Sequence, residues 1–69
     1  MRTKIVYKLK EVREKKNLSL QELAEKSKVA ADIIERTENN KYEPYLIDML
    51  KIADALSVNI EELYEIKEK

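Results

Sequence analysis

The side chains able to do chemistry in this 69-residue sequence are mostly charged or amide groups, because it contains neither histidine nor cysteine. Thiolate nucleophiles, imidazole bases, disulfides and the usual zinc ligands are therefore excluded. Paired carboxylates such as Glu61 and Glu62 could serve acid–base chemistry, but they stand where helix-start charges are expected. Without a nucleophile or a phosphate-binding loop, we expect a binding protein rather than an enzyme, with no metal, cofactor or small-molecule ligand.

The stretch SKVAADIIERTENN, residues 27–40, has an unusual composition for a binding segment. Charged residues make up 41% of the chain, with 14 basic and 14 acidic side chains, so no global basic field indicates a nucleic-acid ligand. Residues 1–16 hold seven basic residues against two glutamates, whereas residues 30–50 hold two basic residues against five acidic ones. The middle of the chain is therefore net negative.

The elements that position this segment are predicted to be helices, because the chain has no glycine, one proline and many strong helix formers. Ser19 with Glu22 and Asn59 with Glu62 have the capping-box spacing that starts a helix. Apolar spacing and turn residues predict five short helices, at about 6–16, 19–27, 30–38, 45–56 and 59–66.

The predicted fold class is all-α, a compact five-helix bundle forming a single domain over residues 1–69. The only apolar run near the start, Ile5 to Tyr7, is too short for a signal segment or a membrane span. We therefore expect a cytoplasmic protein with no membrane association.

Three stretches carry a family resemblance: LKEVREKKNLSLQELAEKSKV, ERTENNKYEP and LKIADALSVNIEELY. In order and separation they resemble the phage-repressor and Cro-like, XRE-type helix-turn-helix family, over about sixty residues. The resemblance implies a lambda-repressor-like fold with the helix-turn-helix at about residues 19–38. It also implies that the helix from Ala30 to Glu38 lies in the DNA major groove and that dimers span two half-sites.

The resemblance further implies a partly buried ion pair between Arg13 and Glu38. Other positions depart from the family pattern. The turn position that is usually glycine is Lys28, and the helix caps that are usually Ser or Thr are Ala30 and Tyr45. Each lost cap should cost about 1 kcal/mol and removes a hydroxyl that could help to hold a phosphate.

The predicted recognition helix is also poor in base-reading side chains. Its outward positions hold Ala31, Asp32 and Glu35, and only Arg36 is of the type that most often reads bases. Asp32 could accept a hydrogen bond from cytosine, but together with Glu35 and Glu43 it repels a polyanion. Departures gathered on one face of a family-typical framework are typical of a rebuilt surface, whether by evolution or by design.

Our first hypothesis is accordingly a protein-binding face on this scaffold, engaging another protein or a second copy of the chain. Ile33 should lie outward or at the edge of the helix, since Ile34 occupies the inward position about 100° away. An apolar cluster with an acidic rim is typical of a protein interface. The predicted face comprises Leu20, Ala30, Ala31, Asp32, Ile33, Glu35, Thr37, Tyr45 and Ile47.

The alternative hypothesis is a dimeric, sequence-specific DNA-binding transcriptional regulator with double-stranded DNA as its partner. It predicts duplex binding that weakens steeply with salt. The family often dimerises through its C-terminal helix, here Leu63, Tyr64 and Ile66, which the sequence places equally well in the core or in an interface. The residues expected to contact DNA are Lys28, Ala31, Asp32, Glu35, Arg36 and Lys41.

Overall fold

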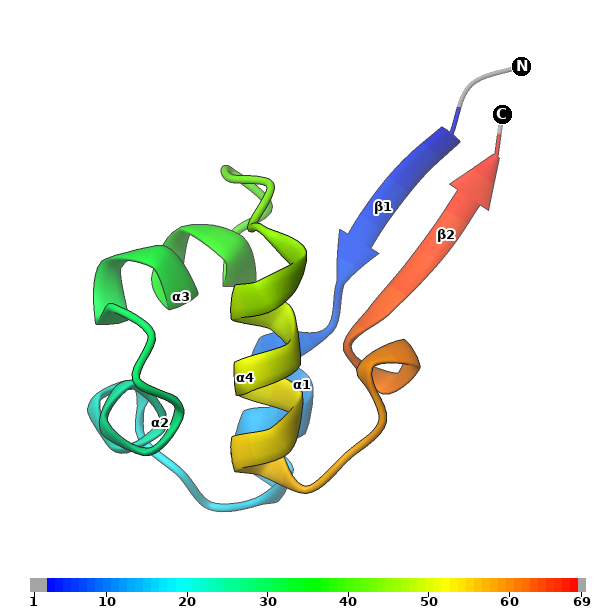
Figure 1. The fold of residues 1–69 in the computed structure, drawn as a ribbon. Coiled ribbons are helices and arrows are strands. Elements are labelled where there is room, and N and C mark those ends of the chain that lie inside the picture. Colours follow the sequence, from blue (N-terminus) through cyan, green and yellow to red (C-terminus); the bar gives the residue numbers. More distant parts are fainter. Residues whose placement is uncertain (1–2, 69) are drawn as a thin grey trace.

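The computed structural model describes residues 3–68 as a helical body with one projecting hairpin (Figure 1). Four helices make up most of the body, and the two strands lie side by side and point away from it. The described residues extend 38 Å along the longest axis and about 20 Å across it. The elements in chain order are β1 (Thr3–Tyr7), α1 (Leu9–Lys15), α2 (Leu20–Ser27), α3 (Ala31–Glu38), α4 (Leu46–Leu56), the 3-10 turn η1 (Ile60–Leu63) and β2 (Tyr64–Glu68).

The core lies where α4 packs against the other helices and η1. Every helix and η1 supply at least one large aliphatic side chain without exposed surface, and α4 supplies the most buried residues. Burying such a side chain stabilises the fold by about 1.5–3 kcal/mol relative to leaving it exposed. The core residues are Leu9, Leu23, Val29, Ile34, Met49, Ile52, Ala53, Ala55, Leu56 and Leu63.

The helix boundaries follow from local chemistry. At the start of α2 the Glu22 N–H donates to Ser19 Oγ (3.1 Å) and the Ser19 N–H donates to Glu22 Oε1 (2.7 Å), which forms the predicted capping box. Asn59 also donates its backbone N–H to Glu62, at the start of η1. Left-handed residues, none of them glycine, lie in the turns after the helices: Asn17, Lys28, Asn40 and Ser57.

The two strands correct the all-α prediction and two of the five predicted helices. The predicted first helix begins at Leu9 instead of Val6, because residues 3–7 form β1. The predicted last helix is only the short turn η1, and the chain then extends into β2. The strands are antiparallel, and aligned pairs such as Ile5 with Ile66 and Tyr7 with Tyr64 favour pairing over helix formation.

The other helices lie close to their predicted positions. Ala30 is the residue before α3 rather than its first residue, and α4 begins two residues after Pro44. The longest of the helices in residues 3–68 has 11 residues, and none of them is long and apolar enough to cross a membrane.

Candidate nucleic-acid interface

The turn between α2 and α3 sets the angle at which the second helix leaves the first. Lys28 ends α2 with φ 64° and ψ 25°, and its N–H donates to the Ala24 carbonyl (2.9 Å). Ser27 is buried, and its hydroxyl accepts a hydrogen bond from the Val29 N–H (3.3 Å). Val29 is itself in the core, so the turn is fixed on both sides of Lys28. A lysine thus occupies a left-handed position that glycine fills without steric cost.

An ion pair fixes the other end of α3 to α1. Arg13 Nε donates to Glu38 Oε2 (2.7 Å) and Nη2 donates to Glu38 Oε1 (3.2 Å), while Nη1 donates to the Leu18 carbonyl (2.9 Å). The two side chains are 11% and 5% exposed, so water competes little for the contact. The hydrogen bond to Glu38 raises the pKa of Arg13 further above its ordinary value. The bidentate geometry orients α3 on the body.

The N-termini of α3 and α4 lack side-chain caps. Neither Ala30 nor Tyr45 forms a side-chain hydrogen bond to the helix that it precedes, whereas Ser19 does so for α2. The unbonded amides of a first helical turn carry a partial positive charge and attract anions. The first-turn amides of α3 and of α4 are therefore left to bond to solvent or to a bound anion.

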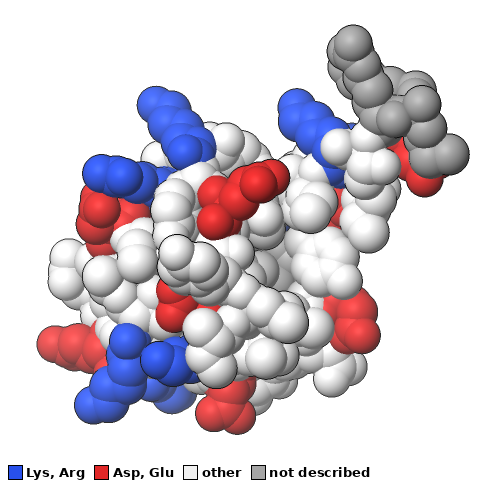
Figure 2. Space-filling model, turned by 45° about the horizontal axis from the view of Figure 1, so that its top comes forward, with Lys and Arg blue, Asp and Glu red and all other residues white. Residues whose placement is uncertain are grey.

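The exposed side of α3 carries the predicted DNA-contacting residues. Asp32, Glu35 and Arg36 are exposed, and Ala31 is half-buried. Arg36 Nε lies 3.2 Å from Asp32 Oδ1, and both side chains are more than half exposed. A pair so exposed contributes only about 0.3–0.5 kcal/mol, so a ligand can separate it easily. Figure 2 shows basic side chains in small groups on the left of the face that it presents, with acidic side chains beside them.

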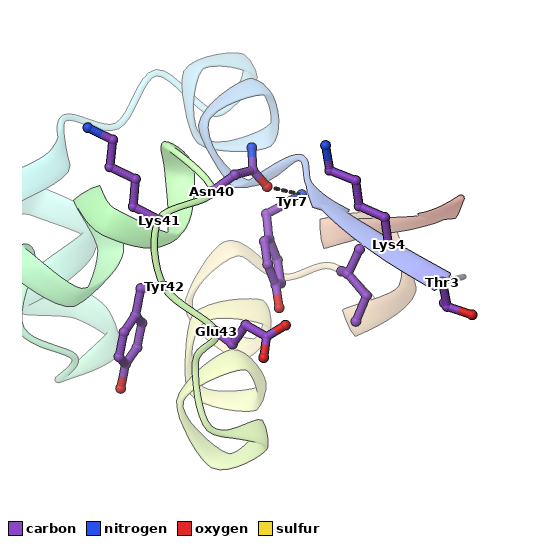
Figure 3. Close-up of a pocket in the computed structure, with 8 residues that line it drawn as sticks. Thr3, Lys4, Tyr7, Asn40, Lys41, Tyr42 and Glu43 are labelled. Carbon is purple, nitrogen blue, oxygen red and sulfur yellow. Dashed lines mark hydrogen bonds between the residues drawn. The ribbon is translucent and has the colours of Figure 1, made fainter. Parts of the chain in front are cut away.

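Two exposed lysines flank α3. Lys28 precedes its N-terminus, and Lys41 follows its C-terminus, where the Lys41 N–H donates to the Arg36 carbonyl (2.9 Å). Lys41 also borders an open hollow of about 440 Å³ between β1 and residues 40–43 (Figure 3). The flanking cations are thus more favourable to a polyanion than the helix between them.

The hollow also contains a contact that joins the hairpin to the body and that the sequence did not predict. The Tyr7 N–H donates to Asn40 Oδ1 (3.1 Å), the dashed contact in Figure 3. Partial burial, and then the negative charge of Glu43, raise the pKa of Tyr7. The only sequence signal was Asn40 at a turn position, because its partner is 33 residues away.

The structure divides the predicted protein-binding face. Thr37 is fully buried, and its hydroxyl donates to the Ile33 carbonyl (2.8 Å), so its place on that face was wrong. Leu20 and Ile33 are half-buried against the core, as the edge position expected for Ile33 allows. Of the remaining large apolar residues, Tyr45 is 72% exposed and Ile47 is 58% exposed. Ala30, Asp32 and Glu35 are exposed and Ala31 is half-buried. Of the four large apolar residues predicted on this face, only Tyr45 and Ile47 are therefore exposed.

The three C-terminal residues that the sequence placed in the core or in an interface also differ in burial. Leu63 is a core residue with no exposed surface, Tyr64 is half-buried, and Ile66 is 57% exposed on β2. Within residues 3–68, no group of three or more acidic side chains is arranged to hold a metal ion.

The comparison with known families agrees with this geometry. A family model described as helix-turn-helix matches residues 9–63, from the start of α1 to the end of η1, and leaves both strands outside. No curated protein matches the sequence. Members of the matched family are typically DNA-binding modules and are not enzymes. Since the matched span covers most of the chain, this protein belongs to the XRE-type helix-turn-helix family.

Proposed function

We propose that this protein binds double-stranded DNA as a sequence-specific transcriptional regulator, with α3 in the major groove. The observation that carries the proposal is the helix-turn-helix match over residues 9–63, which includes α2, its turn and α3. The contact between Arg13 and Glu38 supports it, because it ties the C-terminal end of α3 to α1 and so fixes the position of the proposed recognition helix on the body. The family match favours DNA binding, our alternative hypothesis, over the protein-binding face of our first hypothesis, for which the comparisons offer no support.

Phosphate contacts are proposed at the two uncapped helix starts. The first-turn amides of α3 and α4 would donate to backbone phosphates on either side of the groove, as helix N-termini do for anions elsewhere. Lys28 and Lys41 flank α3 and would add charge neutralisation at each end. Such contacts position a protein on the duplex but do not read its sequence.

Base reading is proposed for Arg36 and Asp32, which lie one helical turn apart on α3. Arginine donates to the O6 and N7 atoms of guanine, and a carboxylate accepts from the N4 amino group of cytosine. The weak exposed pair between these side chains can open to make both contacts. Ala31 would allow close approach to a thymine methyl group. We therefore expect a site that contains at least one G·C pair under α3.

The test is fluorescence anisotropy with pooled random duplexes at about 50 and 200 mM salt, followed by selection of bound sequences. We expect weak binding to the pool that falls with added salt, and tighter binding to the selected sequence. Undetectable binding at the lower salt, or binding insensitive to salt, contradicts the proposal.

A matched pair of variants tests where the DNA lies. Arg36→Ala should weaken the selected site about tenfold or more and relax the choice of base under α3. Lys16→Ala is the control, because Lys16 is an exposed cation beside Ser57 at the C-terminal end of α4, away from the uncapped starts. Equal losses in the two variants would mean that DNA is held only by diffuse charge.

A further inference from the structure

The hairpin has a charged face opposite its apolar one. Successive residues of a strand point to opposite faces of the sheet, and aligned residues of an antiparallel pair share a face. Lys4 aligned with Lys67, and Val6 aligned with Glu65, therefore lie on the side away from Ile5. We call these four residues the lysine face. Its three charged side chains are exposed, and two of them are basic.

Lys4 and Lys67 are like charges placed directly opposite one another. Residues in such positions have Cβ atoms only about 4.5–5.5 Å apart, and like charges there destabilise a sheet. The ion pairs found among residues 3–68 are those of Arg13 and Arg36, so neither lysine is paired with a carboxylate there. A two-stranded hairpin is only marginally stable in water. The lysine face would therefore be stabilised by a bound anion.

A hydrogen bond holds the hairpin beside the C-terminal end of α3. The Tyr7 N–H donates to Asn40 Oδ1 (3.1 Å), and Asn40 is the second residue after that helix. Lys4, Asn40 and Lys41 border one hollow. In Figure 3 the nitrogen ends of these three side chains point to one side, whereas Tyr7 and Tyr42 point to the other. The lysine face thus continues the side of the loop on which Lys41 presents its charge.

An acidic residue limits where an anion can lie. Glu43 lines the same hollow, and its negative charge contributes to the raised pKa of Tyr7. The carboxylate therefore acts on the Tyr7 side of β1, away from the nitrogen of Lys4. An anion is repelled from that side and attracted to the rim that carries the lysines.

We propose that Lys4 and Lys67 contact the sugar-phosphate backbone of a DNA duplex, outside the groove that α3 enters and next to the C-terminal end of α3. The inference rests on the proposed DNA binding and extends the interface to the hairpin. A duplex carries one negative charge per about 1.7 Å of its axis, so it can meet Lys41 and the lysine face together. The family model covers residues 9–63, so both lysines lie outside the matched helix-turn-helix.

The test is fluorescence anisotropy of the full chain with its selected duplex over a series of salt concentrations. The double variant Lys4→Gln with Lys67→Gln should bind about tenfold more weakly at about 100 mM salt. The slope of log K against log salt should become shallower by about one for each lysine removed. Affinity for random duplexes should fall by the same factor, because phosphate contacts do not read sequence.

Two further double variants are the controls. Lys16→Gln with Lys26→Gln removes the same charge from two exposed lysines beside Ser57, which follows α4, and should keep the wild-type slope. Lys4→Arg with Lys67→Arg keeps both charges on the hairpin and should bind DNA as the wild type does. Thermal unfolding of the free Lys4→Gln, Lys67→Gln variant should show a melting temperature no lower than that of the wild type, because a like-charge pair is removed.

Duplex length gives a second readout of the same contact. The selected duplex is shortened by a few base pairs from each end in turn. One of the two shortened duplexes should bind the wild type about as weakly as the full duplex binds the Lys4→Gln, Lys67→Gln variant. That shortening should not weaken the variant further, because both changes remove one and the same contact.

The outcomes separate this inference from the proposed function. A wild type that binds no duplex at low salt contradicts both. A wild type that binds with the expected salt dependence, beside a Lys4→Gln, Lys67→Gln variant that binds equally well, overturns only the contact by the hairpin. An equal loss in the Lys16→Gln, Lys26→Gln control overturns it too, because the lysines would then act only through diffuse charge. So does a loss in the arginine variant, which would mean that shape and not charge is responsible.

Discussion

Leu63 and Ile66 stand three residues apart, yet one belongs to the helical body and the other to the hairpin. Leu63 has no exposed surface, whereas Ile66 is 57% exposed. In the body, aliphatic side chains from five elements surround one another and leave little to gain from a partner. In the hairpin, apolar residues line up on one side of a sheet that has only two strands. The body can therefore account for its own stability, whereas the hairpin gains most from being covered.

The most direct test of this contrast is a pair of alanine substitutions. Leu63→Ala should destabilise the monomer by about 3 kcal/mol, because it leaves a cavity in a packed core. Ile66→Ala should cost less than about 0.5 kcal/mol, as surface substitutions usually do. Urea unfolding, at a protein concentration low enough to avoid self-association, measures both. Similar losses at the two sites would mean that the hairpin is part of the cooperative core.

The second prediction compares the two ion pairs of α3. Glu38→Ala should cost about 2 kcal/mol, since it strands the nearly buried Arg13 without its carboxylate. Asp32→Ala should cost less than about 0.5 kcal/mol, because its contact with Arg36 is solvent-exposed. Urea unfolding at low and high salt separates the two cases, since only the exposed pair should respond appreciably to salt. An equal cost at both sites would contradict the anchoring role given to Arg13.

The sequence predicts more of the structure of the body than of the hairpin. Local signals work within an element, so the Ser19 and Glu22 capping box and the extent of α4 were predicted from spacing alone. The contact between Arg13 and Glu38 spans 25 residues, and only the family resemblance pointed to it. The family pattern also placed left-handed backbone at Lys28, where the structure has it.

The hairpin could not be found in this way, because β1 and β2 pair across nearly the whole chain. Tyr64-Glu65-Ile66 alternates apolar and charged residues, but three residues are too few to distinguish a strand from a helical turn. The candidate site was harder still. Thr37 was placed on the protein-binding face, yet its hydroxyl bonds within α3 and can therefore be buried.

The third prediction concerns the left-handed residues of the body. Ser57 ends α4 at φ 58°, where a side chain beyond Cα is strained, so Ser57→Gly should stabilise the protein by about 1 kcal/mol. Lys51→Gly, at an exposed position inside α4, should destabilise it by a similar amount. Thermal unfolding of the two variants measures the opposite signs. If both variants lose stability, the turn after α4 is not strained.

The smallest effect expected is a pH dependence at the start of α2, which belongs to the body alone. The pKa of Glu22 is lowered from its ordinary 4.5, first by the hydrogen bond from the Ser19 backbone and then by the Ser19 hydroxyl. A carboxyl whose pKa is lower in the folded state contributes stability above its unfolded pKa and loses it as the pH falls through the folded one. Unfolding free energies measured from pH 6 down to about pH 3 should therefore fall less steeply in Glu22→Gln than in the wild type. Ser19→Ala should keep most of the pH dependence of the unfolding free energy, because it removes only the hydroxyl, which is the lesser cause of the lowered pKa. If both variants lost the pH dependence equally, the effect would belong to the hydroxyl instead of the backbone.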